Sequence, residues 1–122
     1  MDAKTIEQFL HQQLDAWNAQ DKEAFFAAYR KVASGGLQIE YVGRTAAEGW
    51  PLLEGMWNQQ NHKIAIDEVI TIVNGSEAAC HNRNKVRGTA TVIDTIELYK
   101  FEPDGCLRVR YFITPPVATP AT

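Results

Sequence analysis

The sequence has little cysteine, no long apolar run and no excess of positive charge. Cys80 and Cys106 form neither a metal-binding motif nor a disulfide framework, so we expect both thiols to be core or sheet residues. No stretch approaches the roughly 18 apolar residues that a membrane-spanning helix needs. The net charge is -3, whereas proteins that bind nucleic acids normally carry a basic excess. We therefore expect no membrane and no nucleic-acid partner.

The signatures of metal sites and phosphate loops are also missing. His11, His62 and His81 lie far apart without ligand spacing, and no glycine-rich phosphate-binding loop occurs. We therefore expect neither a metal nor any other cofactor. The first residues, MDAK, are polar and unlike a signal peptide, and the scarcity of cysteine is typical of a reduced, cytoplasmic protein.

The apolar residues that are present are enough for one packed domain. Hydrophobic residues make up 45% of the 122 residues and charged residues 22%, which is ordinary for a globular protein. We expect a single domain over residues 1–114. The proline-rich tail at 115–122 is expected to lie outside it, because proline cannot join the centre of a sheet.

Three amphipathic helices are predicted in the first half of the chain. Apolar residues recur with helical spacing over residues 6–17, and Gln13 lies within that apolar stripe. Asp21 is a favourable N-cap for a second helix, which ends at the glycine pair 35–36. Pro51 suits the first turn of a third, short helix.

Five strands are expected at residues 37–42, 63–73, 78–87, 89–101 and 106–114. Short turns join the last four, which makes them antiparallel. The predicted fold is therefore an α+β roll, a cone in which three N-terminal helices pack into a strongly curved antiparallel sheet. We expect the cone to enclose a pocket for a small, largely apolar ligand.

Charged and amide side chains alternate along residues 78–87. The charged face faces solvent or a partner, because burying unpaired charge is costly; it holds His81, Arg83, Lys85 and Arg87. Asn82 and Asn84 then face inward. In a pocket these amides would hold a polar ligand group or water, and otherwise they bond to neighbouring backbone groups or to each other.

The strand 89–101 is apolar on both faces, and Glu97 lies within it. If the aromatic side chains of Tyr99 and Phe101 are buried, Glu97 faces inward with them. A carboxyl group in an apolar wall favours its neutral form, which donates a hydrogen bond. In the alternative, Ile96 and Leu98 face the core and Glu97 faces water or a dimer partner.

Three stretches carry a resemblance to a known family. They are AWNAQD at residues 16–21, IEYVG at 39–43 and the final hairpin YKFEPDG at 99–105. With the element order, they resemble the nuclear transport factor 2-like superfamily, which includes ketosteroid isomerases and SnoaL-like polyketide cyclases. The resemblance covers residues 5–114 and implies the fold more strongly than an activity, because the superfamily hosts many enzymes and non-enzymes.

The resemblance also implies site residues. The family's base lies in a stretch similar to 39–43, which implies an inward Glu40, although strand alternation there predicts that Ile39 and Tyr41 face the core and Glu40 faces out. The family's neutral carboxylic acid falls at Glu97, counting from the glycines on either side. Its phenol donor sits where this chain has Gln13, a departure that argues against steroid isomerisation itself.

The resulting hypothesis is proton transfer next to a carbonyl group, as in the isomerisation, dehydration or cyclisation of a small apolar compound. Glu40 would be the ionised base and Glu97 the neutral hydrogen-bond donor. Secondary donors and apolar walls complete the predicted site: Gln13, Asn82, Asn84, Tyr29, Trp57, Tyr99 and Phe101. The alternatives are a binding pocket without catalysis and a homodimer assembled through the sheet. In that homodimer the charged face of residues 81–87 would meet the partner, and a solvated sheet face is an equally good interpretation of it.

Overall fold

Three helices and six strands form the part of the chain that the structure, a computed structural model, describes, which is residues 1–114. In chain order they are α1 (Ala3–Asn18), α2 (Lys22–Val32), β1 (Gly36–Tyr41), β2 (Ala47–Glu48), α3 (Gly49–Gln60), β3 (Ile64–Asn74), β4 (Glu77–Val86), β5 (Val92–Phe101) and β6 (Cys106–Ile113). All the predicted helices and strands occur, and β2 is an addition within a segment expected to be a loop. The predicted tail at 115–122 lies outside the described residues.

The first two helices begin at aspartate caps. Asp2 Oδ1 accepts a hydrogen bond from the Thr5 amide at 2.8 Å, and Asp21 Oδ1 accepts one from the Ala24 amide at 3.1 Å. Each bond satisfies an amide that has no partner within its own helix. The caps fix where α1 and α2 start, and therefore which of their side chains face the sheet.

The six strands form one open sheet with the order β2-β1-β6-β5-β4-β3. β3 to β6 are joined by hairpins and pair antiparallel, as predicted. The sheet as a whole is mixed, because β1 pairs in parallel with β6. The expectation of a wholly antiparallel sheet is wrong for the β1–β6 pair. Residues 42–63, including α3, connect β1 to β3 at the opposite edge of the sheet, so no hairpin follows β1. The hairpin rule therefore says nothing about the partner of β1.

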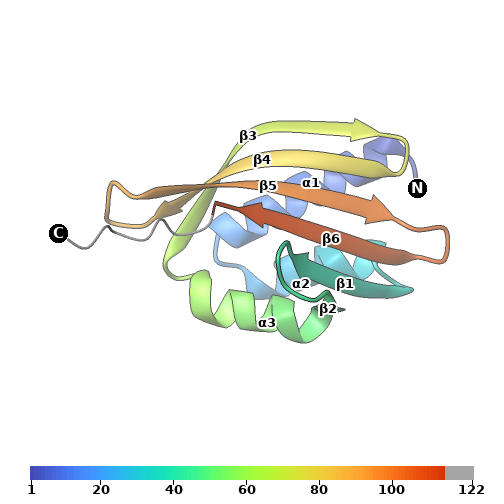
Figure 1. The fold of residues 1–122 in the computed structure, drawn as a ribbon, viewed down its shortest axis with the longest axis horizontal. Coiled ribbons are helices and arrows are strands. Elements are labelled where there is room, and N and C mark those ends of the chain that lie inside the picture. The colour runs from blue at the N-terminus through green and yellow to red at the C-terminus, as the bar shows by residue number, and fades with distance from the viewer. Residues whose placement is uncertain (115–122) are drawn as a thin grey trace.

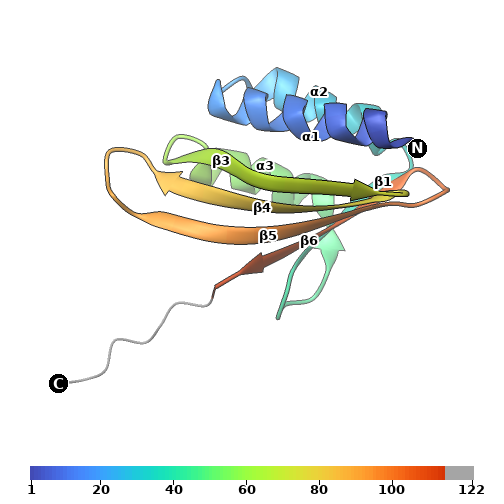
Figure 2. The same cartoon turned by 90° about the horizontal axis from the view of Figure 1, so that it is seen from above.

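The helices cover one face of this curved sheet (Figures 1 and 2). α1 packs against α2 and over β3, whereas α3 packs against β1 near the opposite edge. The core between the layers draws buried side chains from both, among them Phe9, Tyr29, Ile39, Leu53 and Leu107. The predicted α+β class, with three helices against a curved sheet, is confirmed.

The strand register assigns side chains to the two faces of the sheet. His81 lies between Ile70 and Ile96 in one cross-strand row, and Arg83, Lys85 and Arg87 are exposed. The outward orientation predicted for this charged face is therefore correct. Asn82 and Glu97 point to the helix-covered side and are buried.

Candidate functional site

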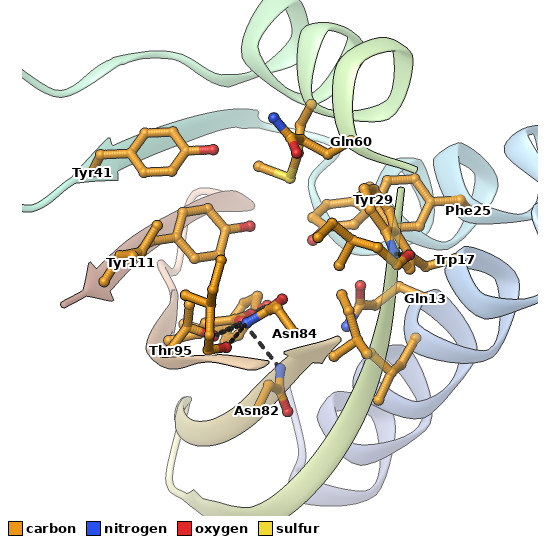
Figure 3. A pocket seen from close by; sticks show the side chains of 18 residues that line it. Gln13, Trp17, Phe25, Tyr29, Tyr41, Gln60, Asn82, Asn84, Thr95 and Tyr111 are labelled. Atoms are coloured by element: carbon orange, nitrogen blue, oxygen red, sulfur yellow. Dashed lines mark hydrogen bonds between the residues drawn. The ribbon is translucent and has the colours of Figure 1, made fainter. Parts of the chain in front are cut away.

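A cavity of about 300 Å³ lies between the helices and the covered face of the sheet (Figure 3). All three helices and every strand except β2 contribute side chains to its lining. The volume is at the lower end of the range for small-molecule sites. In Figure 3 the hydroxyl groups of Tyr29, Tyr41 and Tyr111 point toward the same open space.

Glu97 is the centre of the polar part of the lining. Its residue is only 7% exposed, and its carboxyl group accepts three hydrogen bonds. Oε2 accepts from Asn82 Nδ2 at 3.1 Å and from Thr95 Oγ1 at 3.0 Å. Oε1 accepts from Tyr99 Oη at 2.7 Å. Asn82 Nδ2 can only donate a hydrogen bond, and the hydroxyl groups of Thr95 and Tyr99 lie where they can donate as well.

Asn84 fixes the direction of one of these bonds. Its Nδ2 donates to the Ile93 carbonyl at 2.9 Å and to Thr95 Oγ1 at 3.0 Å. Because Thr95 Oγ1 accepts from Asn84, its own hydrogen is free to point to Glu97. Glu97 Oε2 therefore has two donor groups within hydrogen-bonding distance. The inward placement predicted for Asn82, Asn84 and Glu97 is what the structure shows.

Buried tyrosines surround the carboxylate and keep their protons. Burial raises the pKa of Tyr29, and the negative charge of Glu97 raises it further, while the hydroxyls of Tyr111 and Tyr99 oppose the rise. The pKa values of Tyr99 and Tyr111 are raised well above the ordinary 10.0, chiefly by burial. Burial, followed by the charge of Glu97, also raises the pKa of Tyr41. All four phenols are therefore neutral hydrogen-bonding groups at physiological pH.

Glu40 does not reach this cavity. Its neighbours in β1 face inward, since Ile39 is fully buried and Tyr41 lines the cavity. Glu40 lies on the other face of the sheet, where Arg110 Nη2 donates to its Oε2 at 3.3 Å. Strand alternation gave the correct orientation, and the inward orientation implied by the resemblance is wrong. Glu40 and Glu97 therefore cannot act on one bound molecule.

Five of the seven residues predicted as secondary donors or walls line the cavity: Gln13, Tyr29, Asn82, Asn84 and Tyr99. The side-chain amide nitrogen of Gln13 donates a hydrogen bond to the Leu10 carbonyl oxygen, at 3.1 Å. Trp57 and Phe101 are not part of the lining. Trp57 packs against Trp17 with ring centroids 5.4 Å apart, and the Phe101 ring lies 5.9 Å from that of Phe9. Both are packing residues because their rings are already covered by other aromatic rings.

Several lining residues were not predicted as site residues, among them Tyr41, Thr95, Tyr111 and Gln60. For Tyr111 the signal was present. Along β6, Leu107, Val109 and Tyr111 alternate with arginines, which places the tyrosine on the inward face. Gln60 follows Met56 by one helical turn, and both line the cavity.

The described residues also bear on three other kinds of site, namely membrane, metal and thiol sites. Within residues 1–114 no helix is long and apolar enough to cross a membrane, and no group of three potential ligands is placed to hold a metal ion. Cys80 is 4% exposed, and burial raises the pKa of its thiol to about 12, which makes it a poor nucleophile. Cys106 is a free, half-buried sheet residue.

No protein-family model and no curated protein sequence matches the chain. Several solved structures have a similar fold. A protein from Kribbella flavida DSM 17836, provisionally assigned as a ketosteroid isomerase, has a TM-score of 0.73 at 12% identity, covering 98% of this chain and 84% of that chain. A SnoaL-like protein of unknown function from Burkholderia thailandensis E264 has a TM-score of 0.68 at 17% identity, covering 93% and 98%. A de novo designed protein with a curved β-sheet has a TM-score of 0.73 at 14% identity, covering 94% and 89%.

At these identities the similarity establishes a shared fold and no activity. The designed protein is as similar to this chain as the Kribbella flavida protein is. Function must therefore be argued from the cavity and its residues.

Proposed function

We propose that this chain, which has the nuclear transport factor 2-like fold that its sequence predicts, binds a small and largely apolar molecule in the cavity. The observation that carries the proposal is a cavity of about 300 Å³ with aromatic and aliphatic walls and a cluster of polar groups around Glu97. Small-molecule sites combine apolar walls with a few placed polar groups that fix the orientation of the ligand. Glu97 would hold the polar group of the ligand.

The uncharged fluorescent probe N-phenyl-1-naphthylamine tests this proposal, because its emission rises in apolar surroundings. Ile113 lines the cavity and is 44% exposed, so Ile113→Trp narrows the cavity at its rim with little change to the core. Phe112→Trp is the matched control, since residue 112 lies on the opposite face of the same strand. We expect probe binding to weaken about tenfold in Ile113→Trp and to stay unchanged in Phe112→Trp. No emission rise with the wild-type protein, or the same loss in both variants, would contradict the proposal.

A second candidate function is proton transfer, which the 2.7 Å hydrogen bond between Tyr99 and Glu97 favours. Glu97, as the acceptor, would remove a proton next to a substrate carbonyl, and the surrounding phenols would donate hydrogen bonds to the enolate oxygen. The reaction would be the isomerisation, dehydration or cyclisation of a small carbonyl compound. A β,γ-unsaturated ketone is the test substrate, and ultraviolet absorbance of the conjugated product is the readout. We expect Glu97→Gln to abolish the conversion, and a wild-type rate equal to that of buffer would exclude it.

The outer face of the sheet is a candidate surface for a second copy of the chain. Ile70, His81, Ile96 and Phe112 lie in one cross-strand row, and its three apolar members are each more than a third exposed. Acidic and basic side chains flank this row, namely Asp67, Arg83, Asp94 and Arg110. A surface with an apolar centre and charges of both signs can complement itself across a two-fold axis. We infer a homodimer through this face.

A further inference from the structure

Glu97 has no partner of opposite charge in the described part of the chain. Its three hydrogen bonds come from uncharged donors, and no ion pair of residues 1–114 includes it. Among residues 1–114, no lysine, arginine or histidine lines the cavity, and Glu97 is the one charged residue in its lining. A buried carboxylate without a cation is costly, and hydrogen bonds from neutral groups offset only part of that cost. A bound molecule that supplies positive charge would offset more of it.

The cavity walls favour the same kind of ligand. Tyr29, Tyr41, Tyr111, Trp17 and Phe25 all contribute rings to the lining. A ring that turns its face to the cavity attracts an ammonium group and repels a carboxylate, because that face carries negative potential. A negative charge on Glu97 also attracts an ammonium group. This charge reaches the hydroxyl groups of Tyr29, Tyr41 and Tyr111, because it contributes to their raised pKa values.

The site also offers several hydrogen-bond acceptors to a ligand. A carboxylate has about four acceptor positions, and the described hydrogen bonds to Glu97 occupy three. The hydroxyl oxygens of Tyr29, Tyr41 and Tyr111, which also accept hydrogen bonds, point toward the same space (Figure 3). A protonated primary amine brings three donors, so it can bond to Glu97 and to hydroxyl oxygens together, whereas an alcohol brings one donor and a ketone brings none.

We propose that the cavity binds a protonated organic amine, with its ammonium group at Glu97 and its apolar body between the aromatic side chains of the helices and the sheet. This proposal rests on the small-molecule binding proposed above and names the chemical class of the ligand. It predicts a preference by charge among molecules of nearly the same size and shape.

Three naphthalene compounds separate the effect of charge from that of shape: 2-(1-naphthyl)ethylamine, 2-(1-naphthyl)ethanol and the carboxylate anion of 1-naphthaleneacetic acid. Their affinities at pH 7 are measured by isothermal titration calorimetry and by displacement of N-phenyl-1-naphthylamine. We expect the amine to bind the wild-type protein about tenfold or more tightly than the alcohol, and the carboxylate to bind most weakly, since hydrogen bonds to charged groups are the stronger ones. Glu97→Gln keeps the shape of the side chain and should bring the amine and the alcohol to similar affinity. Glu40→Gln makes the same chemical change on the outer face and should leave the preference intact.

The outcomes separate this proposal from the proposed function. If the alcohol binds the wild-type protein as tightly as the amine, the amine proposal is overturned while small-molecule binding stands. If neither the three compounds nor the uncharged probe binds, both are overturned. The wild-type comparison needs no variant, so it decides the matter even if Glu97→Gln does not fold. A preference for the amine that survives in Glu97→Gln would overturn the role given to Glu97.

Discussion

Removal of one hydroxyl group from the polar cluster gives a direct test of its electrostatics. Tyr99→Phe deletes the donor at 2.7 Å from Glu97 Oε1 and keeps the ring, which is 2% exposed and packs near Phe9. A hydrogen bond to a charged group contributes about 1.5–3 kcal/mol, and the buried oxygen left behind has no replacement donor. We expect the free energy of unfolding to fall by about that amount. For a domain of this length each kcal/mol lowers the melting temperature by about 4 °C, so the expected loss is about 6–12 °C.

Tyr41→Phe is the matched control for this change. Tyr41 also faces the cavity, but it makes no side-chain hydrogen bond within the described residues, so the loss of its hydroxyl should cost less than about 0.5 kcal/mol. Urea denaturation followed by circular dichroism measures both variants. If Tyr99→Phe were as stable as Tyr41→Phe, Glu97 would not depend on the phenol for charge stabilisation. The interpretation of Glu97 as an acceptor-only carboxylate would then be wrong.

The remaining predictions concern alkaline stability, packing and assembly. Burial raises the pKa of Cys80 from 9.0 to about 12 and the pKa values of the cavity tyrosines above 10.0. The contribution of these neutral groups to stability is therefore complete below pH 9 and is lost as the pH rises. The urea concentration at the midpoint of unfolding should fall steadily above pH 9, and a flat profile would contradict the burial of these groups. Gly49→Ala should destabilise the protein, because a Cβ there would lie 2.8 Å from the Leu37 carbonyl oxygen, whereas Gly55→Ala in the same helix meets no atom and should stabilise by about 0.5–1 kcal/mol in thermal melts. Ile96→Lys should convert a dimer into a monomer in light scattering without loss of probe binding, and an unchanged mass would contradict the proposed interface.

Local pattern was enough to predict most of the fold. Helix periodicity, aspartate caps and turn sequences depend on neighbouring residues, and the structure confirms the elements that they predicted. The pairing of β1 with β6 joins residues about seventy positions apart, such as Glu40 and Arg110. No turn connects the two strands, so no local sequence signal records that pairing.

The site was predictable where a strand has one clearly polar face. Charge alternation along β4 placed Asn82 inward correctly. β5 is apolar on both faces, and there the aromatic neighbours of Glu97 indicated its inward orientation while the opposite orientation stayed an alternative. The resemblance failed at Glu40, because position in a motif does not override the two-residue period of a strand whose alternate residues, Leu37 and Ile39, are core. The tyrosines that line the cavity come from β1, α2, β5 and β6. Their positions next to one another depend on the three-dimensional packing of these elements, which local sequence patterns do not predict.

The presence of one carboxylate in the cavity limits the chemistry that it can perform. Proton transfer between two carbon atoms needs a base and a separate acid or hydrogen-bond donor, and two carboxyl groups with different pKa values can supply both. Here the second role would fall to phenols whose pKa values burial raises, so they can donate hydrogen bonds but give up protons poorly. A negative charge held by Asn82, Thr95 and Tyr99 without a cation is better suited to attract a positive group than to exchange protons repeatedly. For this reason we propose binding as the first function and proton transfer as the second, and the conversion of a β,γ-unsaturated ketone is the measurement that distinguishes the two.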